Sequence, residues 1–379
     1  MLYQNAMVFG PDFRFHKGGF AVENGRFARV LEGEIGEGID LGGAYAVPGF
    51  IDVHNHGNSG KDFSDGDYEG LKTLARYLAK NGITSFAPAS VTLPEEQLKS
   101  AYEVAARFAK DAPKGCAVLR GIHMEGPFFS EKKKGAQNGA YLQNPNVEMF
   151  LRLNEAAEGL IKIADVAPEL PGAIPYIEQV SKICKVSLAH TDANYDTAKA
   201  AIAAGATHVT HLFNAMPPFL HRAPGVVGAA AESPWVIGEL ICDGQHVHES
   251  VVRATLSMFG AERLCLISDA LSCCGMQSGE YMLGGQKIVL DGTVARLADA
   301  PDTLAGSANN LFGIFKIALS IGIPAEAAVR MASETPARAL GVEREVGSIA
   351  NGLVADFLVL NPDFSLQRVF LQGSELTEH

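Results

Sequence analysis

The sequence of 379 residues lacks the features that mark several classes of protein. It has no stretch that approaches the roughly 18 apolar residues needed to span a membrane, and its first residues lack the charged and apolar regions of a secretory signal. Basic residues are in the minority, because 31 Lys and Arg face 43 Asp and Glu for a formal net charge of −12. Because nucleic-acid backbones attract clustered positive charge, we expect no nucleic-acid partner. The lack of a membrane span and of a secretory signal leads us to expect a cytoplasmic protein without a membrane partner.

Cysteine is also sparse and shows no metal-binding pattern. The chain has six cysteines, and the adjacent pair Cys273 and Cys274 lacks the two-residue spacing of a zinc knuckle. Free cysteines in apolar surroundings behave as small hydrophobic residues. We expect the pair to serve packing, and a position lining the functional site is the alternative.

The two ends of the chain both carry β-strand signals. Asn24-Gly25 lies between two β-prone runs and is the strongest kind of short hairpin signal. A strand-like run recurs near the other end of the chain. We therefore expect residues 1–47 and 345–379 to form one small β-sandwich domain, with residues 48–344 inserted between them as a larger domain.

The middle of the chain alternates between apolar strand-like runs and amphipathic helical stretches. Eight such runs lie near 49–54, 83–87, 117–123, 161–166, 184–190, 207–211, 236–242 and 264–269. Eight β/α alternations predict an α/β fold of the (β/α)8 TIM-barrel type, whose catalytic groups lie at the C-terminal ends of the strands. Glycine-rich turns predict a hairpin insertion over about 280–297, before a helix that starts near Ser307.

Metal-binding side chains stand where several of these runs end. His54 and His56 end the first run, and because side chains alternate along a strand they point the same way. Glu125 ends the third run, and His190 and His211 end the fifth and sixth. Any one of them could instead be a hydrogen-bonded core or loop residue, but together they predict a metal centre. Histidine and carboxylate ligands without cysteine suit Zn²⁺ or Fe²⁺, as one or two ions.

Two further side chains could take part in catalysis. Asp269 closes the eighth run, where a carboxylate can take a proton from metal-bound water and return it to a leaving group. His246 follows the seventh run and could polarise a carbonyl oxygen. Alternatively, Asp269 could cap the loop that follows it, and His246 could have a purely structural role. His208 should face away from the site as a packing or supporting residue, and His248 should be structural at a helix start.

At these positions the sequence resembles the N-acetylglucosamine-6-phosphate deacetylases of the amidohydrolase superfamily. The motif PGFIDVHNHG at 48–57 is shared across the superfamily, whereas Glu-Gly-Pro at 125–127, His-Leu-Phe-Asn-Ala-Met at 211–216 and Leu-Ala-Gly-Ser at 304–307 are more specific to the deacetylases. The resemblance covers nearly the whole chain. It implies hydrolysis of the N-acetyl group of N-acetylglucosamine 6-phosphate to glucosamine 6-phosphate and acetate.

The resemblance also implies a role for each matching residue. Glu125, His190 and His211 would hold the principal metal, and His54 and His56 would hold a second one. A metal-bound hydroxide would be the nucleophile, Asp269 the general acid/base, and His246 a contact to the acetyl carbonyl or the sugar. The residues expected to bind substrate are Ala136, Gln137, Asn214, Ala215, Arg222, His246 and Leu304. In this family the arginine can reach across a dimer interface, so a homodimer is expected.

Two departures from the family pattern leave the exact amino sugar open. Ala223 stands where an acid often follows the arginine, and Ser268 where threonine is common. Cys273-Cys274 is also unusual for the family, and Gln137 stands where some members carry histidine. The alternatives are a deacetylase of N-acetylgalactosamine 6-phosphate or another amidohydrolase, such as a dihydroorotase-like or aminoacylase-like enzyme. A non-enzymatic scaffold would keep the ligands without the proton chemistry.

Overall fold

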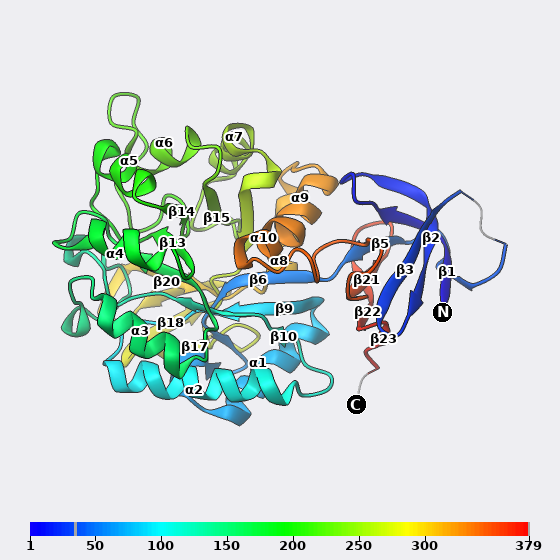
Figure 1. The fold of residues 1–379 in the computed structure, drawn as a ribbon, viewed down its shortest axis with the longest axis horizontal. Helices are drawn as coiled ribbons and strands as arrows, with labels where there is room; N and C mark the ends of the chain where they lie inside the picture. The colour runs from blue at the N-terminus through cyan, green and yellow to red at the C-terminus, as the bar shows by residue number, and fades with distance from the viewer. Residues whose placement is uncertain (34–35, 378–379) are drawn as a thin grey trace.

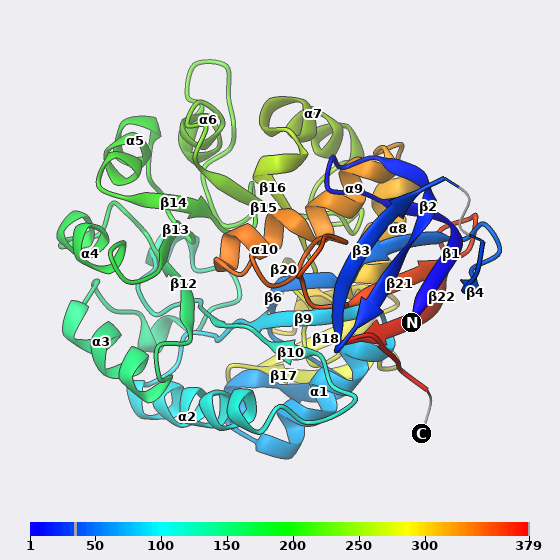
Figure 2. The ribbon, with the colours of Figure 1, turned by 45° about the vertical axis from the view of Figure 1, so that its right-hand side comes forward.

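The computed structural model describes residues 1–33 and 36–377. Its main body is an α/β structure around a curled sheet of parallel strands with helices outside it (Figures 1 and 2). The principal parallel strands are β6 (Phe50–Asn55), β9 (Ile83–Pro88), β11 (Ile122–Met124), β12 (Ile161–Val166), β13 (Lys185–Leu188), β14 (Ala206–Val209), β15 (Ile237–Ile241) and β16 (Leu264–Ile267).

Two backbone bridges join the parallel strands into a ring. One sheet runs β11-β12-β13-β14-β15-β16, and the other runs β10 (Val118–Leu119), β9 and β6. Ala89 after β9 pairs with His123 of β11, and Asn55 of β6 pairs with Ala270 after β16. The curled sheet is therefore consistent with the expected barrel, and the carboxyl ends of its strands meet at one mouth.

The helices cover the outside of this sheet because each presents one apolar face. In α1 (Tyr68–Lys80), Leu71, Leu74, Ala75 and Leu78 are buried, and the Asp67 side chain caps the first turn. The other helices are α2 (Glu95–Asp111), α3 (Val147–Ala156), α4 (Ala173–Val180), α5 (Tyr195–Ala203), α6 (Gly225–Ala231), α7 (Glu249–Phe259), α8 (Leu311–Ser320), α9 (Ala325–Ala332) and α10 (Glu334–Leu340). His248 is the N-cap of α7, in agreement with the structural role expected for it.

Strands from both ends of the chain pair in a second sheet at one side of the body (Figure 1). Its strands are β1 (Leu2–Phe9), β2 (Phe15–Glu23), β3 (Arg26–Glu32), β4 (Ile39–Asp40), β5 (Tyr45–Pro48), β21 (Phe357–Leu360), β22 (Leu366–Leu371) and β23 (Ser374–Glu375). The antiparallel pairing of β21 with β5 ties the two ends together. A separate apolar cluster lies on this sheet, where Phe357 stacks on Phe370 with ring centroids 4.1 Å apart.

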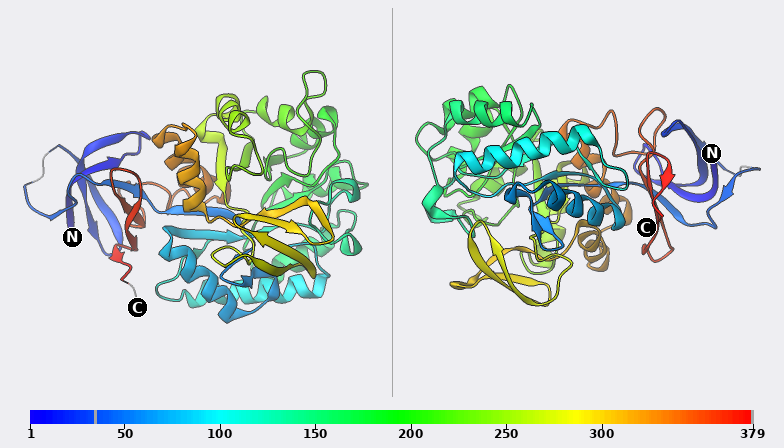
Figure 3. Two further views of the ribbon diagram at one scale, coloured as in Figure 1. Left: turned by 180° about the vertical axis from the view of Figure 1, so that it is seen from behind. Right: turned by 90° about the horizontal axis from the view of Figure 1, so that it is seen from below.

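A four-stranded antiparallel sheet follows β16 (yellow in Figure 3). It consists of β17 (Gly279–Leu283), β18 (Gln286–Asp291), β19 (Val294–Leu297) and β20 (Ala300–Ser307). The antiparallel segment thus extends beyond residue 297, where the hairpin insertion was expected to end. The reason is that β19 turns back and pairs with β20, and the following helix α8 begins at Leu311 rather than near Ser307.

One short antiparallel pairing remains among the described strands. Strands β7 (Gly57–Asn58) and β8 (Lys61–Asp62) form a small ribbon after β6. None of the helices in residues 1–33 and 36–377 combines the length and the apolar character that a membrane crossing requires.

Candidate active site

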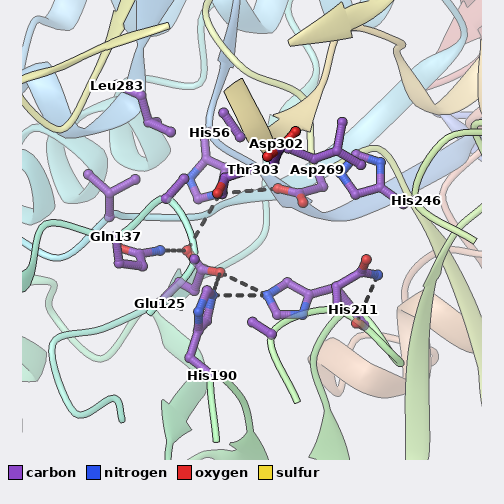
Figure 4. A pocket seen from close by; sticks show the side chains of 18 residues that line it. His56, Glu125, Gln137, His190, His211, His246, Asp269, Leu283, Asp302 and Thr303 are labelled. Carbon is purple, nitrogen blue, oxygen red and sulfur yellow. Dashed lines mark hydrogen bonds and ion pairs between the residues drawn. The ribbon is translucent and has the colours of Figure 1, made fainter. Parts of the chain in front are cut away.

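A cavity of about 270 Å³ opens at the mouth formed by the carboxyl ends of the parallel strands (Figure 4). The expected site residues that line it are His56, Glu125, Ala136, Gln137, His190, His211, Asn214, Ala215, His246, Asp269 and Leu304. His54 is fully buried next to His56 and does not reach the cavity surface. The structure therefore gathers residues from most of the chain length around one space.

Glu125, His190 and His211 converge at the base of the cavity. The Oε1 atom of Glu125 lies 3.1 Å from Nε2 of His190 and 3.3 Å from Nε2 of His211. The two Nε2 atoms are 3.1 Å apart, so two imidazole nitrogens and a carboxylate oxygen point at one place. The Nδ1 atom of His190 donates to the Lys133 carbonyl at 3.0 Å, with Nε2 left toward the cavity. This donor set suits a divalent cation.

His54, His56 and Asp269 form a second convergent group beside the first. The Nε2 atoms of His54 and His56 are 3.3 Å apart, and Asp269 Oδ1 lies 3.6 Å and 3.3 Å from them, respectively. Each ring is anchored through Nδ1, since His54 bonds Glu239 at 2.9 Å and His56 bonds the Ala89 carbonyl at 3.1 Å. Anchoring at Nδ1 leaves both Nε2 atoms aimed at a common point, which also fits a cation.

The Glu125 carboxylate lies between the two groups. Its Oε1 faces His190 and His211, and its Oε2 lies 3.6 Å from Nε2 of His56. Burial opposes ionisation of this carboxyl, but hydrogen bonds and charge from the surrounding imidazoles hold its pKa well below the usual value. The Oε1 atom also lies 3.7 Å from Nε2 of His54, so this ionised carboxylate approaches both histidine pairs and could bind two cations or one.

Gln137 contacts Glu125 directly. Its Nε2 donates to Glu125 Oε2 at 2.5 Å, and its Oε1 accepts from the Thr92 backbone N–H at 2.7 Å. Gln137 also lines the cavity, so the substrate contact expected for it stays a prediction beside this observed contact with Glu125. The neighbouring Ala136 carbonyl accepts from Gln286 on β18, which ties the antiparallel insertion to this wall.

Three site residues adopt left-handed backbone conformations just after their strands. The φ angles are 43° for His190, 29° for His211 and 46° for Asp269. Such angles are strained for residues other than glycine, and hydrogen bonds hold them. In Asp269, for example, the N–H donates to the His54 carbonyl at 3.0 Å, and the carbonyl accepts from Ser307 at 2.8 Å. The sharp turn after each strand brings the side chain into the cavity.

Asp269 is positioned to exchange protons at the cavity surface. The residue is 8% exposed. Burial would raise the pKa of its carboxyl, but the hydrogen bond to His56 and the charges of His54, His56 and His211 outweigh burial and lower it. The group is therefore ionised at neutral pH and able to accept a proton.

His246 is held by a carboxylate that sequence reasoning did not identify. Its Nδ1 lies 2.7 Å from Asp243 Oδ2, and Asp243 Oδ1 accepts the backbone N–H groups of Gln245 and His246 at 2.9 Å each. Burial alone would raise the pKa of Asp243. The hydrogen bonds and the charge of His246 outweigh burial and lower this pKa below its usual value, so the carboxyl is ionised. The anchored Nδ1 leaves Nε2 as the ring nitrogen for a ligand in the cavity. Asp243 lies three residues before His246, a spacing that was the available signal.

The two side chains expected to bind phosphate, Asn214 and Arg222, lie in different places. The Asn214 side-chain amide donates to the carbonyls of His211 and Leu212 at 3.2 and 3.1 Å, so it closes the turn after β14. Arg222 is exposed and lines a different surface depression, beside Tyr195 and Pro224. Of the described residues that line the cavity, none is a lysine or arginine. Arg222 therefore lies away from the cavity of its own chain, and its expected role at the substrate stays a prediction.

The antiparallel insertion supplies lining residues that the sequence motifs did not reveal. Leu283, Asp302 and Thr303 line the cavity together with Leu304, and Val91 adds an apolar contact. Leu283 packs near Val91 at the tip of the first hairpin, since Gly284 closely approaches Val91. Residues 302–303 directly precede the Leu-Ala-Gly-Ser motif, but nothing in residue type marked them as cavity residues.

Comparison with known proteins places these features in a family. A model described as the amidohydrolase family matches residues 45–376. The N-acetylglucosamine-6-phosphate deacetylase of Vibrio furnissii is 36% identical over 340 residues, which cover 89% of this chain and 84% of the relative. The N-acetylgalactosamine-6-phosphate deacetylase of Escherichia coli O157:H7 is 32% identical, covering 86% of each chain.

A solved structure is similar over the whole length. It is a mutant N-acetyl-D-glucosamine-6-phosphate deacetylase from Mycobacterium smegmatis in complex with N-acetyl-D-glucosamine-6-phosphate. The match has a TM-score of 0.94 at 33% sequence identity, and covers 100% of this chain and 99% of the other. The likeness therefore includes the small sheet and the antiparallel insertion as well as the parallel strands.

Proposed function

The chain belongs to the amidohydrolase family and, within it, to the N-acetylglucosamine-6-phosphate deacetylases, and on this premise we propose that it hydrolyses N-acetylglucosamine 6-phosphate to glucosamine 6-phosphate and acetate. The observation that carries the proposal is the position of Asp269 next to two converging groups of imidazoles around Glu125, at the edge of one cavity. Amide hydrolysis needs an activated water and a proton for the leaving amine, and this cluster offers sites for both.

The metal-binding residues of this proposal are those of the two convergent groups. Glu125, His190 and His211 would hold one divalent cation, and His54 and His56 would hold a second. A cation bound there would lower the pKa of a water molecule and neutralise negative charge on the amide oxygen. The imidazole and carboxylate donors suit Zn²⁺ and Fe²⁺ alike.

Asp269 would carry the proton through the reaction. Its carboxylate is ionised before the reaction, because the neighbouring histidines lower its pKa. It would accept a proton as water attacks the acetyl carbon, and deliver that proton to the nitrogen as the C–N bond breaks. An amine leaves readily only when its nitrogen is protonated, so both transfers are needed.

His246 and the apolar wall would orient the acetyl group. Asp243 anchors Nδ1 of His246, so Nε2 can contact the acetyl carbonyl or a sugar hydroxyl. Leu304 would border the acetyl methyl, with Val91 and Leu283 beside it. The backbone of Ala136 and Ala215 would contact the sugar phosphate.

We propose that the active form is a homodimer in which Arg222 of one copy reaches the substrate of the other. Among the described residues that line the cavity there is no lysine or arginine from its own chain, although a phosphate monoester is recognised best by arginine. Phe219 and Leu220 beside Arg222 are 45% and 51% exposed, and such apolar side chains are typical of a surface that pairs.

The substitution Arg222→Gln tests this part of the proposal. We expect it to raise KM for the phosphosugar by about ten- to a hundredfold, the effect of one charge-assisted hydrogen bond, with kcat nearly unchanged. Arg29→Gln on β3 removes the same charge from an exposed position and serves as the control. An unchanged KM in Arg222→Gln, or a monomeric parent protein in solution with full activity, would contradict the shared site.

The choice between sugar epimers is tested by turnover on both phosphosugars. The deacetylase of Vibrio furnissii, named for the glucosamine epimer, is 36% identical to this chain, and a relative named for the galactosamine epimer is 32% identical. We expect acetate release from N-acetylglucosamine 6-phosphate with a kcat/KM at least tenfold above that for the galactosamine epimer. The reverse preference would reassign the enzyme to the second substrate.

We also propose a domain division and a location for this protein. Residues 48–344 would form a (β/α)8 barrel domain, and residues 1–47 and 345–379 a small β-sandwich domain. The shared sheet of β21 and β5 and its own apolar cluster support the division. The cytoplasmic location stays a prediction from the sequence.

A further inference from the structure

A layer of buried polar side chains lies inside the parallel strands, beneath the two convergent groups. Its central member is Glu239 on β15, which is fully buried. The Oε1 atom of Glu239 accepts from Nε2 of His208 at 3.0 Å, and Oε2 accepts from Nδ1 of His54 at 2.9 Å. The proposed reaction uses no atom of Glu239, yet a buried carboxylate is retained only where it is paired.

Glu239 contacts both halves of the proposed metal site. Through Oε2 it bonds His54, a member of the second group, and it also accepts the backbone N–H of His211, a member of the first, at 3.3 Å. Its backbone carbonyl accepts the N–H of Leu212 at 2.9 Å. The same residue therefore holds the left-handed turn at His211 and the ring orientation of His54.

The cluster of His54, His123 and Glu239 is compact enough to suggest a third metal position, but its hydrogen bonds argue against one. Both ring nitrogens of His123 are engaged, Nδ1 with the Val53 carbonyl at 3.0 Å and Nε2 with Asp165 Oδ1 at 2.9 Å. Nδ1 of His54 is engaged by Glu239. These atoms thus form a hydrogen-bonded support for the ligands above.

We propose that Glu239 is a positioning residue that prepares both halves of the metal site. A neutral imidazole carries one N–H, and a carboxylate that accepts it at Nδ1 leaves the Nε2 lone pair for a cation. By also fixing the backbone at His211, Glu239 sets the direction of that ring. The inference rests on the proposed metal-dependent function.

Asp165 on β12 provides a matched control inside the same layer. It is also fully buried, and its Oδ1 accepts from His123 Nε2 and from Thr210 Oγ1, each at 2.9 Å. No hydrogen bond links the Asp165 side chain to any of the proposed ligands among the described residues. Loss of its charge disturbs the buried layer without touching a ligand.

The test is the affinity of metal-free protein for Zn²⁺, measured by competition with a chromophoric chelator. We expect Glu239→Gln to weaken Zn²⁺ binding by about 10- to 100-fold, and Asp165→Asn to change it by less than about threefold. Thermal unfolding of the metal-free variants reports the structural effect separately. Parent-like Zn²⁺ affinity in Glu239→Gln, or equal losses in both variants, would overturn the proposal.

A second variant covers the case in which Glu239→Gln does not fold. Glu239→Asp keeps the charge of the layer but withdraws the carboxylate by one methylene, so it is expected to fold and to show the same kind of loss. Parent-like affinity in Glu239→Asp would also overturn the proposal. Failure of the parent protein to bind Zn²⁺ would instead contradict the proposed metal centre itself, so the two failures are distinguishable.

Discussion

Asp269→Asn is expected to lower kcat for acetate release by about a thousandfold or more, with KM little changed. The asparagine has nearly the same shape, but its amide can neither accept the proton from water nor return it to the amine. General acid and base transfers each contribute about 10²- to 10⁴-fold, and one residue performs both here. The measurement is steady-state acetate release with the metal content of parent and variant determined in parallel.

Asp302→Asn is the comparison for this result. Asp302 is a second carboxylate that lines the same cavity, but no hydrogen bond or ion pair connects its side chain to the described histidines. We expect its substitution to change kcat by less than tenfold. If Asp269→Asn kept parent-like kcat with full metal content, the proton-transfer role of Asp269 would be wrong.

Glu125→Gln is expected to remove bound metal from the whole site and to lower kcat/KM by at least about a thousandfold. Glu125 is the side chain whose two oxygens face both histidine pairs. The amide keeps its volume but loses the charge that favours a cation, and a catalytic cation is worth several kcal/mol in the transition state. Metal analysis of the purified variant and its rate of acetate release check both effects.

His56→Gln separates one metal from two. His56 belongs to the second group, and its imidazole makes no hydrogen bond to His190 or His211. In a two-metal enzyme, His56→Gln should lose about half of the metal while Glu125→Gln loses nearly all. Full metal content in Glu125→Gln would contradict the proposed central role of this carboxylate.

The positions of the proposed ligand residues could be predicted from the sequence because strand ends are visible as apolar runs. His54 lies on β6 and His56 directly follows its last residue, while Glu125 directly follows β11, so the ends of the apolar runs placed all three at one mouth. The pairing of the chain ends through β21 and β5 likewise agrees with the hairpin signals. Local sequence patterns could therefore predict which side chains lie at the carboxyl ends of the parallel strands.

The remaining features depend on contacts between distant segments. Glu239 is a single acid in a buried strand, and only the assembled strands show that it reaches both His54 and His211. The positive φ angles at the strand ends belong to residues other than glycine, so residue type gave no sign of them. The contact of Gln137 with Glu125 arises from a loop closure that spacing does not reveal, and the expected substrate role of Gln137 stays a prediction.

Arg222 illustrates a different limit. The residue type indicated a phosphate partner, but the exposed loop carries the side chain away from the cavity of its own chain. A residue that acts in the site of a second copy cannot be recognised from local sequence pattern, except through exposed apolar residues beside it. Such neighbours are recognised only when burial is known, as for Phe219 and Leu220.

The most direct test of the proposed function is turnover by the metal-loaded protein on N-acetylglucosamine 6-phosphate and on unphosphorylated N-acetylglucosamine. Acetate and free amine are measured together. We expect equimolar release of both products from the phosphosugar, with kcat/KM at least about a hundredfold above that for the unphosphorylated sugar, as charged recognition of a phosphate implies. Equal rates on the two sugars, or no acetate from the phosphosugar, would contradict a phosphosugar deacetylase.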